Sequence, residues 1–142
     1  MRRPSAERGS VLMLMPAAAL IVLLLGAIAF DLSVVFLRQR QASSLAVDVA
    51  NDLASAALDE GTFRASGRFE LDPERADELG RLLVISSDLA DEVVDVEITV
   101  MGPDVVEVRL VVRVDYVFAR AIPGAGDATT VTAAATATAV LG

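Results

Sequence analysis

The stretch VLMLMPAAALIVLLLGAIAF, residues 11–30, holds twenty consecutive positions without a charged side chain. A helix of this length spans about 30 Å, which is the thickness of the hydrocarbon core of a bilayer. The three arginines within residues 1–10 favour a cytoplasmic N-terminus, and the apolar pattern resumes at residues 32–37. The stretch therefore predicts a single transmembrane helix over residues 11–37, with the rest of the chain outside the cytoplasm.

A cleaved secretory signal is the alternative interpretation, because Ala27-Ile28-Ala29 fits the small-x-small pattern of cleavage sites. The apolar core of such signals usually runs about 7–15 residues, whereas this one fills twenty positions and resumes beyond Asp31. We therefore favour a retained anchor. The alternative predicts a secreted binding module of the cell envelope whose mature chain begins near Phe30.

Helical spacing continues beyond the apolar stretch, with apolar residues on one side between Ala42 and Leu58 and acidic residues on the other. One helix is thus predicted from about Val11 to Leu58, with residues 38–59 as an amphipathic extension outside the lipid. Its small residues would allow close packing, which we expect against the chain's own domain, with a neighbouring subunit as the alternative. These helix-packing residues are Ala42, Ala46, Ala50 and Ala54.

Residues 60–142 predict an extracytoplasmic domain that begins with a loop and a second, short helix. Glu60-Gly61 and the following residues indicate the loop, with a short strand at Arg68–Leu71. Asp72-Pro73-Glu74 then gives a helix start, with Asp72 as the N-cap and Pro73 at the first helical position. The apolar spacing extends this helix to about Leu89.

From Val93 the apolar period becomes two, which predicts strands. The first alternation runs from Val94 to Val100, a turn at Met101–Asp104 follows, and the second alternation runs from Val106 to Phe118. After a Pro/Gly interruption, Thr and Ala alternate in a third strand with small side chains on its inner face. The expected fold is α+β: a long N-terminal helix, a second short helix and a small antiparallel sheet of about three strands.

Charge divides the chain as sharply as hydrophobicity does. Residues 1–40 hold five Arg against two carboxylates, and residues 41–142 hold seven Arg against eighteen, which gives about +3 and −11. Such an acidic domain disfavours nucleic-acid binding. The chain has no Cys and no His, which removes disulfides, the usual zinc sites and Ser-His-Asp or Cys-His catalysis. We expect no enzyme activity, no cofactor and no small-molecule substrate.

Three charged residues mark the outer end of the apolar stretch. Asp31 follows twenty uncharged positions, and we expect its carboxylate either among lipid headgroups or paired with an Arg of a neighbouring subunit. Arg38 and Arg40 are predicted to be interfacial anchors whose guanidinium groups reach water.

A cluster of acidic residues, Asp88, Asp91, Glu92 and Asp95, lies where the second helix gives way to the first strand. Calcium prefers oxygen ligands, but the ordered Asp-x-Asp-x-Asp-Gly pattern is missing, so a solvated surface is the expected interpretation.

Residues 8–57 resemble the TadE/TadG-like proteins of tight-adherence (Flp-type) pilus systems. The resemblance rests on Arg8-Gly9, the apolar helix, Asp31 at its outer end, the basic cluster Arg38/Arg40 and an Ala/Asp-rich helix. The hairpin, the Pro-Gly connection and the Thr/Ala-alternating last strand are similar as well, so the resemblance covers nearly the whole chain.

This resemblance implies a minor pilin-like or assembly subunit, anchored in the cell membrane, whose partners are other pilus or secretion subunits. The contacts would run through the N-terminal helix and a free sheet edge. It also makes Gly9 the candidate processing site, although Leu14 would then take the fifth mature position, where Glu is typical of the substrates of prepilin peptidases.

Overall fold

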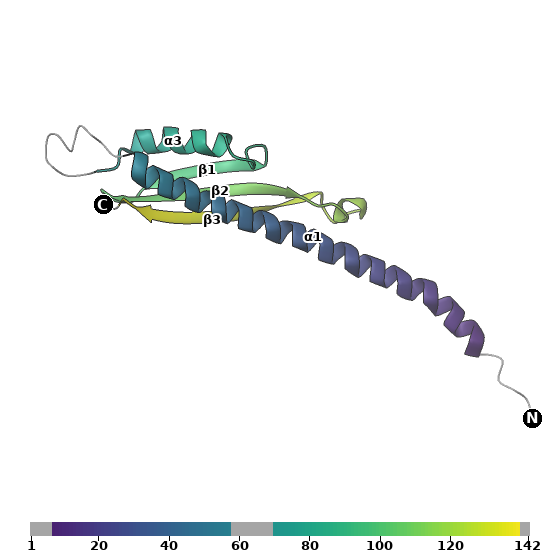
Figure 1. Ribbon diagram of the computed structural model, residues 1–142. Coiled ribbons are helices and arrows are strands. Elements are labelled where there is room, and N and C mark those ends of the chain that lie inside the picture. The colour runs from purple at the N-terminus through teal and green to yellow at the C-terminus, as the bar shows by residue number, and fades with distance from the viewer. Residues whose placement is uncertain (1–6, 58–69, 140–142) are drawn as a thin grey trace, which may run out of the picture.

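The computed structural model describes residues 7–57 and 70–139, with side-chain burial described from residue 14 onward. Within these residues, two α-helices, α1 (Glu7–Ala56) and α3 (Pro73–Ile85), pack on a three-stranded antiparallel sheet (Figure 1). The predicted α+β fold is confirmed. The predicted loop and the first two residues of the short strand predicted at Arg68–Leu71 fall outside the described residues. Leu71 forms a single bridge, and its N–H donates to the Pro103 carbonyl at 2.8 Å.

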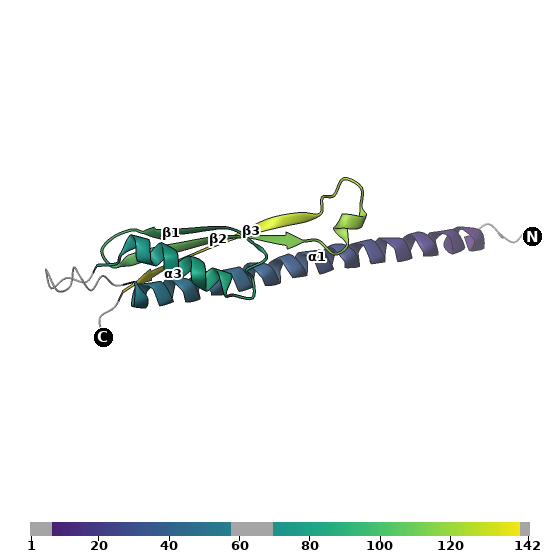
Figure 2. The same cartoon turned by 90° about the horizontal axis from the view of Figure 1, so that it is seen from above.

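Helix α1 is continuous over 50 residues, or about 75 Å, as the unbroken apolar phase predicts. Pro16 lies within its first turns and does not end it. The C-terminal part of α1 lies across the sheet, whereas its N-terminal part extends far beyond the sheet (Figures 1 and 2). The same helix therefore contributes to the domain core and continues away from the domain as a free helix.

The sheet has the order β1-β2-β3 and contains β1 (Val93–Val100), β2 (Val105–Asp115) and β3 (Ala128–Thr138). Residues 101–104 connect β1 to β2 as predicted, with the Met101 N–H donating to the Val105 carbonyl at 2.9 Å. One face of the sheet is covered by both helices, and its other face carries Thr and charged side chains. The strand residues buried under the helices are Val106, Val108, Leu110, Val112, Val114, Val131, Ala133 and Ala137.

One strand prediction is wrong in its first residue. Val94 was expected to face the core with Val96, Ile98 and Val100, but its side chain is exposed. The register of β1 on β2 shifts at this point, because Val93 pairs with Val112 while Asp95 pairs with Val111. Val94 is the extra residue of a β-bulge, which reverses the face of the residues before it, so that Val93 packs on the core instead.

Helix α3 begins as the sequence predicts. The Asp72 Oδ1 atom accepts the N–H groups of Glu74 at 2.9 Å and Arg75 at 3.3 Å, with Pro73 at the first helical position. The helix ends at Ile85, one turn before the predicted Leu89. Gly80 is buried, and a Cβ there would meet the Ile98 side chain and lie 3.1 Å from the Leu53 Cδ1 atom. The missing side chain lets α3 lie close to both α1 and β1.

The close fit of α1 on the sheet predicts that added volume at the helix stripe destabilises the domain. Ala46 is fully buried, so Ala46→Leu should lower the free energy of unfolding by about 1–3 kcal/mol. Val47→Leu, at the next and exposed position, should change it by less than about 0.5 kcal/mol. Thermal unfolding of the full chain in detergent, followed by circular dichroism, measures both, and equal midpoints in the two variants would contradict the packing described here.

Candidate functional site

Asp31 is the one buried charged side chain of the described residues, with 5% of its surface exposed. Its carboxylate accepts three consecutive backbone N–H groups from the connection between β2 and β3. Oδ1 lies 2.8 Å from the Val117 nitrogen, and Oδ2 lies 2.7 Å from the Ala119 nitrogen. The Phe118 nitrogen lies 3.1 Å and 3.2 Å from the two oxygens. We call this arrangement the Asp31 clamp.

The clamp explains why β2 ends earlier than its sequence pattern predicts. The alternation of apolar residues continues to Phe118, but β2 stops at Asp115. Successive N–H groups of a strand point in opposite directions, so three of them can converge on one carboxylate only where the backbone turns. The turn continues into a short 3-10 helix, η1 (Ala119–Ala121). The first N–H groups of a helix have no acceptor within the helix, and here the Asp31 carboxylate accepts that of Ala119.

An aromatic contact lies beside the clamp. The rings of Phe30 and Phe118 pack edge to face with their centroids 5.4 Å apart. This is a favourable geometry for two aromatic rings. Two adjacent residues of α1, Phe30 and Asp31, thus hold the same connection by an apolar contact and by charge-assisted hydrogen bonds.

The structure shows donors for Asp31 that neither prediction included, because both oxygens of its carboxylate are engaged by backbone N–H groups of the same chain. A position among lipid headgroups and pairing with an Arg of a neighbouring subunit stay predictions. The sequence contains no direct sign of these donors, because any residue except Pro supplies a backbone N–H. A carboxylate that interrupts an apolar helix was nevertheless the correct place to look.

The two predicted anchor arginines lie in different surroundings. The Arg38 Nη2 atom lies 2.7 Å from the Glu92 Oε1 atom, and its Nη1 atom donates to the Gln41 Oε1 atom at 3.0 Å. Arg38 is therefore directed toward the connection between α3 and β1, whereas Arg40 is exposed. Between them, the Gln39 side chain donates to the Thr132 carbonyl of β3 at 2.9 Å.

The predicted packing stripe is buried within the protein itself. Ala42, Ala46, Ala50 and Ala54 all belong to the core cluster that α1 forms with β2 and β3. These four residues are consequently not accessible to a neighbouring helix in this structure, which corrects the alternative interpretation of the stripe. Gly9, the candidate processing site, lies in the first turn of α1.

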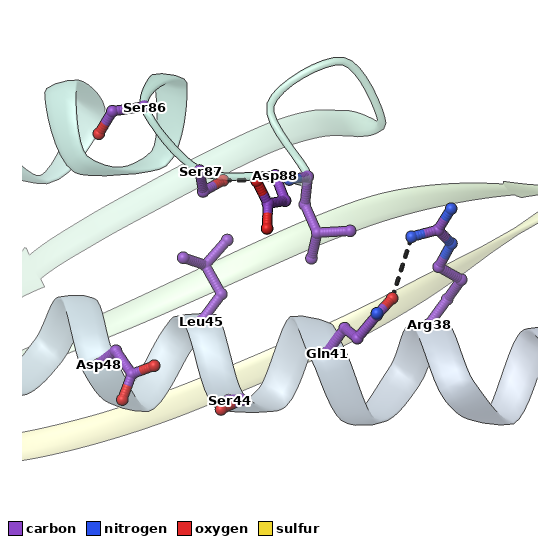
Figure 3. Close-up of a pocket in the computed structure, with 9 residues that line it drawn as sticks. Arg38, Gln41, Ser44, Leu45, Asp48, Ser86, Ser87 and Asp88 are labelled. Atoms are coloured by element: carbon purple, nitrogen blue, oxygen red, sulfur yellow. Dashed lines mark hydrogen bonds between the residues drawn. The ribbon is translucent and has the colours of Figure 1, made fainter.

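An open cleft of about 410 Å³ separates α1 from the connection between α3 and β1 (Figure 3). Arg38, Gln41 and Asp48 line it from α1, and Ser87 and Asp88 line it from the connection. The Ser86 and Ser87 hydroxyl groups donate to carbonyls of the last turn of α3, at Leu82 and Val84, so they serve to end that helix.

The predicted acidic cluster does not come together as a metal site. Within residues 7–57 and 70–139, no three acidic side chains gather closely enough to hold a metal ion. Glu92 turns toward Arg38 instead of toward the other three carboxylates. Asp88, Asp91 and Asp95 are all exposed, as the expected solvated surface requires.

Comparison of the chain with protein-family models, curated proteins and solved structures returned no match.

Removal of the Asp31 carboxylate should release the β2–β3 connection. Hydrogen bonds to charged groups contribute about 1.5–3 kcal/mol, so Asp31→Ala should speed amide hydrogen exchange at Val117, Phe118 and Ala119 by about tenfold or more. Asp48→Ala, which removes an exposed carboxylate of the same helix, should leave these rates unchanged. Exchange measured residue by residue in detergent tests this, and unaltered protection in Asp31→Ala would show that the clamp does not order the connection.

Proposed function

We propose that the protein is a single-pass membrane subunit of a tight-adherence pilus or a related secretion apparatus, with its N-terminus in the cytoplasm and its domain outside. The role is structural, through subunit contacts, and involves no catalysis. The resemblance of residues 8–57 to TadE/TadG-like proteins supports the assembly, and the division of α1 into an exposed apolar part and a buried part supports the anchor.

That division is the observation that carries the proposal. From residue 14 to residue 30 every side chain is exposed except Ala27, which is half-buried, although the segment is apolar throughout. The helix is long and apolar enough to cross a membrane, and almost none of its most apolar part is buried within the protein. An apolar surface of this size on a soluble protein would be unusual, because such surfaces normally contact lipid or another protein.

Two surfaces remain for partner subunits once the alanine stripe is used internally. The first is the lipid-facing side of α1, along which another membrane helix can pack. The second is the free edge of the sheet, at β1 on one side and at β3 on the other, where no neighbouring strand lies among the described residues. An unpaired edge presents backbone N–H and C=O groups that a strand of another subunit can bind.

A matched pair of substitutions tests the anchor. Leu20 and Leu82 are both exposed, at 69% and 57%, but Leu20 lies near the middle of residues 11–30 and Leu82 lies on α3. An Arg at the bilayer centre costs about 2.5–3.5 kcal/mol or more, so Leu20→Arg should remove the protein from alkali-washed membranes. Leu82→Arg should leave it there, because that side chain faces water.

The same pair tests the assembly role in a strain that lacks the gene. The strain should lose surface pili or the secreted product of the apparatus, and both the wild type and Leu82→Arg should restore them. Leu20→Arg should fail to do so. A deletion without any effect on the cell surface would refute the assembly role while leaving the anchor unaffected.

N-terminal sequencing of the native protein from membrane and medium separates this proposal from the secreted alternative. We expect membrane-bound protein that begins at residue 1 or 2, or at Ser10 if processing occurs after Gly9. The alternative predicts a chain released into the medium that begins near Phe30. The continuity of α1 through Ala27–Asp31 favours retention. The contacts of Phe30 and Asp31 with the domain fit both chains, because the cleaved chain would keep both residues.

A further inference from the structure

The connection between β2 and β3, residues 116–127, exposes large apolar side chains at one end of an acidic domain. Val117, Phe118 and Ile122 are all more than two-fifths exposed, and Phe118 is 47% exposed. The Asp31 clamp holds this segment against α1, so its apolar side chains are presented in fixed positions. A segment ordered in this way, with its apolar side chains outward, indicates that it contacts a surface other than water.

The connection lies against the apolar part of α1. In both views it is at the end of the sheet from which the free part of α1 extends (Figures 1 and 2). Together the two segments line a shallow apolar hollow of about 210 Å³, and its lining residues include Ala27, Ile28, Leu32, Phe118 and Ile122. The exposed apolar surface of the helix thus continues onto the connection across a mostly apolar hollow, whose polar lining residues are Asp31 and Tyr116.

The length of the apolar stretch fixes the depth of the connection. If residues 11–30 fill the hydrocarbon core, Phe30 and Asp31 lie at its outer boundary. Hydrogen bonds of 2.7–2.8 Å from the Asp31 carboxylate to Val117 and Ala119 then place the connection at the same level. This level is the interface between acyl chains and headgroups, where apolar side chains beside a basic one are favourable.

From this geometry we infer that the β2–β3 connection inserts Val117, Phe118 and Ile122 into the interface of the bilayer that α1 crosses. The inference rests on the membrane anchor of the proposed function and deepens it. The domain is then attached to the membrane at two points, the helix and the connection, and cannot rotate freely about its anchor.

The chemistry of the connection matches a lipid surface. Arg120, the one basic residue within residues 116–127, is exposed beside the three apolar side chains and suits anionic headgroups. Asp127, the one acidic residue of this segment, lies at its far end, where β3 begins. The Asp31 carboxylate lines the same hollow as Phe118 and Ile122 and is already engaged by backbone donors.

Single tryptophans provide the test, because the chain contains no Trp. Phe118→Trp reports on the connection, Leu20→Trp on the anchor, and Met101→Trp on the opposite end of β2, where Met101 is 63% exposed. Each full-length variant is placed in nanodiscs that hold one protein and contain phosphatidylethanolamine and phosphatidylglycerol. Fluorescence is compared between ordinary lipids and lipids that carry bromine on their acyl chains.

We expect bromine to quench Leu20→Trp and Phe118→Trp strongly, by about half, and Met101→Trp hardly at all, because Met101 lies about 35 Å farther along the sheet. Addition of Asp31→Ala to Phe118→Trp should weaken the quenching, since the clamp no longer holds the connection at the interface. The thermal midpoint of each variant identifies any that fail to fold, and in that case Ile122→Trp replaces Phe118→Trp.

The possible results distinguish the membrane anchor from the insertion of the β2–β3 connection. If Leu20→Trp is quenched by lipid but Phe118→Trp is quenched only by aqueous iodide, the connection faces water and the inference is wrong while the anchor stands. That surface would then be free for a protein partner. If no variant is quenched by brominated lipid, the anchor itself fails. If Phe118→Trp is shielded from both quenchers in discs with a single protein, contact with lipid is likewise excluded.

Discussion

Close approach of one helix to one sheet, made possible by small side chains on both surfaces, is the constraint on which the rest of this structure depends. Ala42, Ala46 and Ala50 of α1 pack in the same core as Ala133 and Ala137 of β3. These small side chains leave little volume between α1 and β3, so the helix packs close to that strand. It therefore reaches the β2–β3 connection within hydrogen-bonding distance, and a short Asp side chain suffices to hold that connection.

Most of the fold could be predicted because it follows from periodicity. The apolar run and its in-phase continuation specify α1, Asp72-Pro73 specifies the start of α3, and the change to a period of two specifies the strands. The errors occur where the alternation of apolar residues continues but the regular strand does not. Val94 continues the alternation but is displaced by a bulge, and Phe118 continues it but lies beyond a turn that Asp31 stabilises.

The sequence identified the acceptor of the Asp31 clamp but not its donors. Asp31 was identifiable because an ionisable side chain in an apolar helix requires compensation. Its donors were not, because they are backbone groups far along the chain and any non-proline residue provides them. The alanine stripe was ambiguous for a different reason: small residues permit close packing without specifying whether a sheet or another helix approaches. The burial of these alanines in the core shows that the sheet is what covers them.

The path of α1 also determines when the domain can fold during synthesis. The helix that supplies a third of the buried core residues is made first, and the strand that covers its alanines is made last, roughly eighty residues later. Synthesis proceeds at about 5–20 residues per second, so the side of α1 that becomes buried stays uncovered for several seconds until Ala133 and Ala137 are made. Contacts between such distant residues also form slowly. The core of the nascent chain therefore remains open until the last strand has been made.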